Sequence, residues 1–203
     1  MSSFIQDIWA FFLTLKSKSY NYYLNYGKDN SVTRMREENS MQDKVYSFFA
    51  KPNKIIERDN IQLFLGSAYN SANYNVLLDL GINKIINITE EIPNHFEDKL
   101  DYLKISILDD SNSKINTDSL DKINDFVKEY DTVYVHCYQG ASRSAAVILH
   151  LLMSKFNFSI EEGLDYLCKK HPITNINVEF INNLKEYHKL KNDNDNDNDN
   201  DND

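Results

Sequence analysis

Residues 132–144 read TVYVHCYQGASRS, and most of the fold can be inferred outward from them. The first five residues are mainly β-branched or aromatic, which predicts a buried strand. The loop that follows leads into the strongly apolar segment 144–156, which predicts a helix. A strand, a short loop and a helix in this order direct consecutive backbone N–H groups and a helix N-terminus at one point. Such an arrangement suits an anion, and above all a phosphate group.

Strand and helix patterns alternate on both sides of this stretch. Gly66 marks the end of one predicted strand, and Gly81 marks the end of a predicted helix. We expect strands at 61–65, 82–88 and 102–107, and helices at 72–80, at 120–127, after the Ser159–Glu162 capping box and at 177–191. This alternation predicts an α/β fold with a central, mainly parallel, twisted sheet flanked by helices.

Composition divides the 203 residues into three parts. Residues 1–54 form an N-terminal extension, and residues 55–191 form the α/β domain. Residues 192–203 alternate Asn and Asp without an apolar side chain, which predicts a disordered tail. Six of the acidic residues lie in this tail. The net charge of the whole chain is −9, and that of residues 1–191 is therefore only −3.

The N-terminal extension has apolar residues at helical spacing near its start, which predicts a short amphipathic helix. These residues are Ile5, Ile8, Trp9, Phe12 and Leu15. We expect the helix to pack against the domain. A membrane-surface or partner anchor is the alternative, but lysine is scarce beside the apolar stripe, whereas surface anchors favour a basic face.

Charge and cysteine content exclude several classes of protein. No stripe of Lys and Arg is present, so we expect no nucleic-acid partner. The apolar run 8–15 is too short to span a bilayer, so we expect no transmembrane segment. Two cysteines, Cys137 and Cys168, cannot form a disulfide framework, which favours a reducing compartment. We therefore expect a cytoplasmic, or also nuclear, monomer.

The residue types in the loop favour nucleophilic chemistry on a phosphate. Gly140 allows the backbone to approach the anion closely, because it has no Cβ. Arg143 can grip two phosphate oxygens with its planar guanidinium. Cys137 lies at the base of the loop, where the helix dipole and the N–H groups favour a thiolate. A thiolate that faces a phosphorus atom is placed for attack.

Residues 136–144, HCYQGASRS, resemble the H-C-x5-R-S signature of cysteine-dependent protein phosphatases. The form HCxxGxSRS is similar to that of the dual-specificity branch, in particular its small atypical members. Segments 61–67, 80–88 and 171–180 are also similar to family elements, although His171 stands where Arg is usual and Ile176 where Pro is usual. The resemblance covers about residues 55–190 and implies a protein-tyrosine-phosphatase-like fold.

The resemblance implies a role for each residue of the loop. Cys137 attacks phosphorus and forms a cysteinyl-phosphate intermediate. Arg143 and the backbone N–H groups of the loop hold the phosphate oxygens. Ser144 donates its hydroxyl to the sulfur, and His136 orders the loop and supports the thiolate. The substrate-binding loop residues are Tyr138, Gln139, Gly140, Ala141, Ser142 and Arg143.

The family also places an aspartic acid after the strand that begins at Tyr102. Two adjacent residues, Asp109 and Asp110, are candidates for this general acid. The family's spacing of seven residues from Tyr102 selects Asp109. The steps need no metal or cofactor, and no histidine has zinc-ligand spacing with either cysteine.

Loop composition bears on the substrate. The residues between Cys137 and Arg143 are uncharged, whereas phosphoinositide phosphatases of this class usually carry Lys there. We expect a phosphorylated protein substrate with dual specificity for phosphotyrosine and phosphoserine or phosphothreonine; a protein kinase is one candidate. The alternatives are a phosphoprotein-binding pseudophosphatase and a scaffold acting through the N-terminal extension. A further hypothesis is that Cys168 traps oxidised Cys137 as a disulfide.

Overall fold

The structure is a computed structural model that describes residues 51–200 except 109 and 111–112. The strands are β1 (Asn53–Arg58), β2 (Ile61–Ser67), β3 (Lys84–Asn87), β4 (Asp101–Lys104) and β5 (Thr132–Cys137). The helices are α3 (Ala68–Ser71), α4 (Tyr74–Asp79), α5 (Thr117–Phe126), α6 (Arg143–Phe156), α7 (Ile160–Lys170) and α8 (Val178–Asn200). The helix expected near the start of the chain lies outside the described residues.

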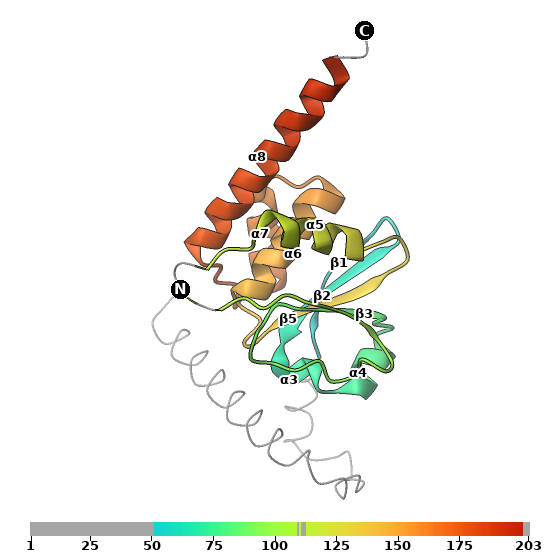
Figure 1. Cartoon of the computed structure of the whole chain (residues 1–203). Coiled ribbons are helices and arrows are strands. Elements are labelled where there is room, and N and C mark those ends of the chain that lie inside the picture. The colour runs from blue at the N-terminus through green and yellow to red at the C-terminus, as the bar shows by residue number, and fades with distance from the viewer. Residues whose placement is uncertain (1–50, 109, 111–112, 201–203) are drawn as a thin grey trace, which may run out of the picture.

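The strands form one sheet in the order β1-β2-β5-β3-β4. The pairs β2–β5, β5–β3 and β3–β4 are parallel, and only β1 is antiparallel to its neighbour. Helices cover both faces, with α3 and α4 on one and α5 to α8 on the other (Figure 1). The mainly parallel α/β sheet predicted from the sequence is confirmed.

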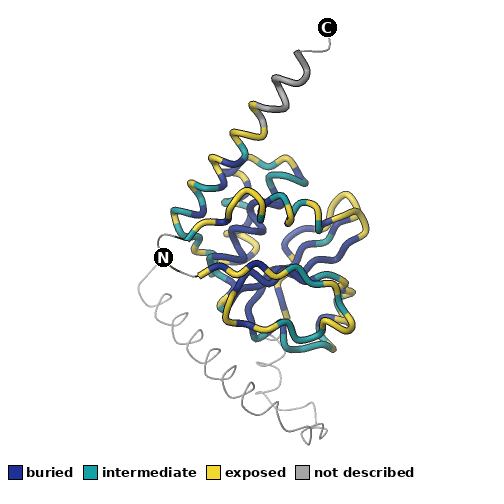
Figure 2. Tube along the Cα trace, viewed as in Figure 1, coloured by how far each residue is buried: buried dark blue, intermediate teal, exposed yellow. Residues whose placement is uncertain are grey.

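The central strand β5 organises the core, since all six of its residues are buried. On one face Tyr134 packs in a cluster with Phe64 and Leu77, beside α4. On the other face Val133 and Val135 join the larger cluster that contains the buried residues of α6. Figure 2 shows the buried residues concentrated in the sheet and in α6. The loop between β5 and α6 therefore lies between two elements that are largely buried.

Strand β1 was not predicted from the sequence. It forms a hairpin with β2 through Asp59 and Asn60, which have φ angles of 53° and 60°. Two successive residues with positive φ are typical of the tight turns that suit the twist of a hairpin. The Asp-Asn pair was the signal that could have identified this turn.

Other predicted boundaries differ from the observed ones. The helix expected at 72–80 corresponds to α4, which is shorter at both ends and has Asn73 as its N-cap, accepting a hydrogen bond from the Val76 N–H. The short helix α3 before it was not predicted. The helix expected to end at residue 191 is α8, whose bounds are Val178–Asn200. Neither Gly nor Pro occurs between residues 178 and 200, and hence no local stop signal ends α8.

None of the helices in the described residues is long and apolar enough to cross a membrane.

Candidate active site

The candidate site lies at the carboxyl end of β5, where residues 138–142 connect the strand to α6. The neighbouring strand β2 ends at Ser67, which is paired with Cys137, and β3 ends at Asn87, which is paired with His136. In open α/β sheets, ligands bind outside the carboxyl ends of the strands. The loop predicted to carry the chemistry is therefore placed where this fold offers a binding site.

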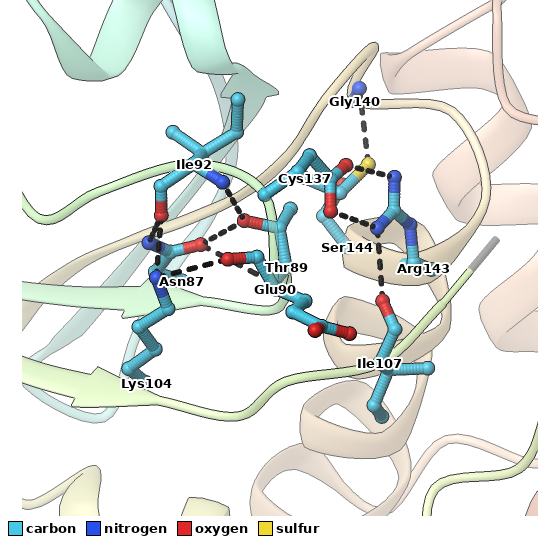
Figure 3. Close-up of polar contacts among 11 residues, drawn as sticks. Asn87, Thr89, Glu90, Ile92, Lys104, Ile107, Cys137, Gly140, Arg143 and Ser144 are labelled. Atoms are coloured by element: carbon cyan, nitrogen blue, oxygen red, sulfur yellow. Dashed lines mark hydrogen bonds and ion pairs between the residues drawn. The ribbon is translucent and has the colours of Figure 1, made fainter.

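Cys137 is buried, with 1% of its surface exposed, and it lies at the base of a pocket. Its Sγ accepts a hydrogen bond from the Gly140 N–H at 3.2 Å and another from the Ser144 hydroxyl at 3.1 Å (Figure 3). Hydrogen bonds to the charged form of a group favour that form. Both donors are directed at the sulfur, so that each is placed to bond a thiolate.

The carbonyl groups of the loop are bonded to neighbouring segments. The Tyr138 carbonyl accepts from the Ala68 N–H at 3.1 Å, and the Ala141 carbonyl accepts from the Asn175 N–H at 2.9 Å. No peptide bond in the described residues is cis. In a trans peptide, C=O and N–H point in opposite directions. The N–H groups that follow these two carbonyls are consequently directed away from Ala68 and Asn175, and are available to an anion.

Gly140 is needed for the shape of this loop for two reasons. Its φ angle is +82°, in the region that L side chains rarely adopt. A Cβ at this position would also lie 2.5 Å from the backbone carbonyl oxygen of Gly66. The loop thus lies directly on the backbone of β2, and a side chain here would push it away.

The pocket above Cys137 has a volume of about 290 Å³. One wall is the loop, through Gln139, Ala141 and Ser142. The other is the segment between α7 and α8, through Asn175, Ile176 and Asn177. Sequence reasoning noted the family similarity of the second segment but did not assign it to the site. None of these lining residues carries a formal charge apart from a Cys137 thiolate.

Arg143 is the first residue of α6, and its side chain donates hydrogen bonds to two residues, Ile107 and Glu91. Its Nη1 donates to the Ile107 carbonyl at 2.9 Å and to Glu91 Oε2 at 3.2 Å, while Nη2 donates to Glu91 Oε1 at 2.9 Å. The Arg143 side chain is only 3% exposed, whereas that of Glu91 is 42% exposed. This two-pronged ion pair fixes the guanidinium plane. Glu91 is a residue of the site that sequence reasoning did not assign.

The loop that carries Glu91 is itself fixed by side chains at the ends of β3 and β4. Asn87 donates from Nδ2 to the Ile92 carbonyl at 2.9 Å, and its Oδ1 accepts from the Thr89 hydroxyl at 2.7 Å. Lys104 Nζ donates to the same Ile92 carbonyl at 2.6 Å. Figure 3 shows this network beside Arg143. Glu91 therefore approaches Arg143 from a rigid loop.

The ion pair alters the acidity of Glu91. Partial burial acts to raise the pKa of Glu91, but the hydrogen bonds and charge of Arg143 and nearby backbone N–H groups outweigh it and lower the pKa. Glu91 is therefore ionised at neutral pH. The positive charge of Arg143 is partly balanced before any phosphate binds.

His136 is fully buried, and burial lowers its pKa to about 3. Its ring stacks on Tyr134, with centroids 5.4 Å apart and planes at 14°. At neutral pH the imidazole is uncharged. Any support that it gives to a thiolate therefore comes without a positive charge.

The two candidate acids differ in what the structure describes. Asp109, the predicted general acid, lies outside the described residues. Asp110 is exposed, and its backbone carbonyl accepts a hydrogen bond from Asn177 Nδ2 at 3.0 Å. Because Asn177 lines the pocket, this bond ties the Asp110 backbone to the pocket wall.

No group of three or more potential metal ligands occurs among the residues that the structure describes.

Comparison with known proteins gives one family. The family described as "Dual specificity phosphatase, catalytic domain" matches residues 63–190. Human dual specificity protein phosphatase 4 is 34% identical over 128 residues, which are 62% of this chain and 32% of that protein. Dual specificity protein phosphatase 1-A of Xenopus laevis is 31% identical over 128 residues, which are 62% of this chain and 35% of that protein. The chain thus spans about one third of the length of these relatives.

Solved structures agree with this result. The human tyrosine phosphatase-like serine/threonine/tyrosine-interacting protein superposes with a TM-score of 0.61 at 26% identity, covering 70% of this chain and 98% of that chain. Human DUSP28 superposes with a TM-score of 0.59 at 22% identity, covering 70% of this chain and 95% of that chain. The second likeness concerns the fold alone.

The close contact of Gly140 with β2 can be tested by the substitution G140A. We expect it to weaken oxyanion binding strongly and to lower the free energy of unfolding, because the new Cβ displaces the loop. G81A is the matched control, since Gly81 also has a positive φ, of 70°, but a Cβ there meets nothing within 4 Å. Calorimetric titration with tungstate and urea unfolding measure the two effects. Equal losses in both variants would mean that backbone strain, and not the contact with Gly66, decides the result.

The Glu91–Arg143 pair predicts a pH-dependent stability. A group whose pKa is lowered on folding stabilises the folded chain above its unfolded pKa, and this stabilisation is lost as the pH falls through the folded value. We expect E91Q to reduce the free energy of unfolding near pH 7, and by progressively less as the pH falls through the lowered pKa of the folded Glu91 carboxyl. Urea unfolding at a series of pH values from neutral into the acid range measures this. The control is E90Q, and a pH-independent effect of E91Q would contradict the prediction.

Proposed function

The chain belongs to the dual specificity phosphatase family, and from this membership we propose that it is a metal-independent cysteine phosphatase that acts on phosphotyrosine and on phosphoserine or phosphothreonine in proteins. The observation that carries the proposal is the environment of the Cys137 sulfur. It receives two hydrogen bonds that favour a thiolate, and it lies at the base of a pocket lined by backbone groups suited to phosphate oxygens.

In the first step the Cys137 thiolate attacks phosphorus. An S–P bond forms, the bond from phosphorus to the substrate oxygen breaks, and that oxygen takes a proton from Asp109. The loop N–H groups and Arg143 stabilise the charge on the phosphate oxygens during the transfer. The fixed guanidinium of Arg143 needs little reorganisation to do so, because Glu91 and the Ile107 carbonyl already hold it.

In the second step Asp109, now ionised, takes a proton from water. The water oxygen attacks phosphorus, the S–P bond breaks, and inorganic phosphate leaves with Cys137 again as a thiolate. The hydroxyl of Ser144, 3.1 Å from the sulfur, stabilises the departing thiolate. Both steps balance without a redox change or a metal ion.

Two features support a phosphoprotein as the substrate. The pocket wall of Asn175, Ile176 and Asn177 is uncharged, so it offers no basic group for a polyphosphorylated headgroup. The charge pattern also lacks the basic stripe typical of nucleic-acid partners. A protein kinase is one candidate substrate.

Both cysteines have free thiols, which fits a reducing compartment such as the cytoplasm or nucleus. We propose that the chain acts as a monomer.

The proposed activity can be tested by phosphate release from phosphotyrosine and phosphothreonine peptides in the presence of chelator. We expect the wild-type protein to hydrolyse both peptides and C137S to hydrolyse neither, because serine is a much weaker nucleophile at this position. Binding of the peptides to C137S shows that the variant is folded. If freshly reduced wild-type protein binds both peptides without turnover, the chain is instead a phosphoprotein-binding module.

The choice of Asp109 over Asp110 can be tested with a matched pair, D109N and D110N. Loss of a general acid costs about 10²- to 10⁴-fold in rate, and most where the leaving oxygen is basic. We therefore expect D109N to slow phosphothreonine hydrolysis far more than that of an aryl phosphate with an acidic leaving group, and D110N to have little effect. The reverse pattern would assign the role to Asp110.

A further inference from the structure

His171 is a buried residue at the end of α7 that contacts the phosphate-binding loop from outside the pocket. It is 6% exposed, and its backbone N–H donates to the Leu167 carbonyl at 2.8 Å. Its Nε2 lies 2.9 Å from the Gly140 carbonyl oxygen. Its Nδ1 lies 2.8 Å from Nδ2 of Asn53, in β1. The imidazole thus joins the loop to the edge strand of the sheet.

The contact with Asn53 determines which ring nitrogen carries the proton. The amide nitrogen of Asn53 is a donor, so that Nδ1 must accept from it. The same amide nitrogen is 3.5 Å from the Lys170 carbonyl, which disfavours the rotated amide because that would place its oxygen beside the carbonyl. The proton of the neutral ring is therefore on Nε2, where it is donated to the Gly140 carbonyl.

This hydrogen bond orients a peptide group of the loop. The Gly140 carbonyl belongs to the peptide whose N–H is that of Ala141, and the two groups of a trans peptide point in opposite directions. Because His171 holds the carbonyl outward, the Ala141 N–H is directed to the other side, and Ala141 lines the pocket. The N–H of Gly140 itself donates to the Cys137 sulfur.

The other outward bonds of the loop come from backbone donors. The Tyr138 carbonyl is bonded to the Ala68 N–H, and the Ala141 carbonyl to the Asn175 N–H. A side-chain substitution leaves such donors in place. Of these three bonds, only the one to Gly140 comes from a side chain, and it can be removed alone.

We propose that His171 is a positioning residue for phosphate transfer: its Nε2–H holds the Gly140 carbonyl so that the Ala141 N–H faces the phosphate oxygens. The proposal rests on the proposed phosphatase function and deepens it. His171 does not contact the reacting atoms. It acts through the loop, and Asn53 sets its tautomer.

The experiment compares H171Q with H171N, which differ by one methylene group. The amide nitrogen of Gln reaches as far as an imidazole Nε2, whereas that of Asn is too short to reach the Gly140 carbonyl. T174V is the control for packing of the same segment, because the Thr174 hydroxyl donates to the His171 carbonyl at 2.7 Å and not to the loop. The readouts are kcat and KM with a phosphopeptide, tungstate affinity by calorimetry and the melting temperature.

We expect H171N to lower kcat/KM about 10- to 100-fold, and to weaken tungstate binding in parallel. This is less than the loss of about 10²- to 10³-fold seen when an oxyanion donor is removed, because the Ala141 N–H is misdirected and not removed. H171Q should retain most of the wild-type kcat/KM and tungstate affinity, and T174V should be close to the wild type in both. The melting temperature shows that each variant is folded at the assay temperature.

Equal impairment of H171Q and H171N, or a loss in T174V as large as that in H171N, would overturn the proposal, because segment packing alone would then account for the effect. Wild-type tungstate affinity in H171N would overturn it as well. Tungstate titration needs no turnover, so it tests His171 even if the wild-type protein hydrolyses no phosphopeptide. Failure of the proposed function and failure of this inference are therefore distinguishable.

Discussion

The site depends on the hydrogen bonds that hold the carbonyl groups of one short loop away from the pocket. With these carbonyls bonded to the Ala68 N–H, His171 and the Asn175 N–H, the following N–H groups face the opposite side without further cost. The donors come from the first residue of α3 and from the segment between α7 and α8. A separate set of contacts, from the loop around Glu91, fixes the guanidinium of Arg143. Dipoles and charge are thus oriented independently before substrate arrives.

The elements of the fold that follow from local patterns were predictable, and those that depend on distant partners were not. A run of β-branched residues identified β5, and a long apolar segment identified α6. Strand β1 was missed because it has only two buried residues among exposed polar ones, and its pairing with β2 depends on a turn with positive φ at Asp59 and Asn60. The extent of α8 was missed because no glycine or proline marks its end.

At the site, too, residues that are close in the sequence were predictable, and those brought together only by folding were not. Cys137, Gly140 and Arg143 lie within seven residues of each other, so their spacing alone indicates a phosphate-binding loop. Glu91 approaches Arg143 from a loop 52 residues earlier, and nothing local distinguishes it from Glu90. In the structure, Asn87 and Lys104 both bond the Ile92 carbonyl and so fix the turn from which Glu91 contacts Arg143. His171 was noticed as a departure from the family pattern, but its bond to Gly140 requires the folded chain.

The pairing of Arg143 with Glu91 has a consequence for how binding responds to salt. A buried guanidinium that is partly balanced by a carboxylate adds less to the long-range field at the mouth of the pocket, and the lining residues other than Cys137 are uncharged. The attraction for a phosphate group then comes mainly from backbone dipoles at contact distance. Mobile ions screen interactions between separated charges far more than such short contacts. The affinity of this pocket for a phosphorylated side chain should accordingly vary little with ionic strength, and the rate of association should owe little to electrostatic steering.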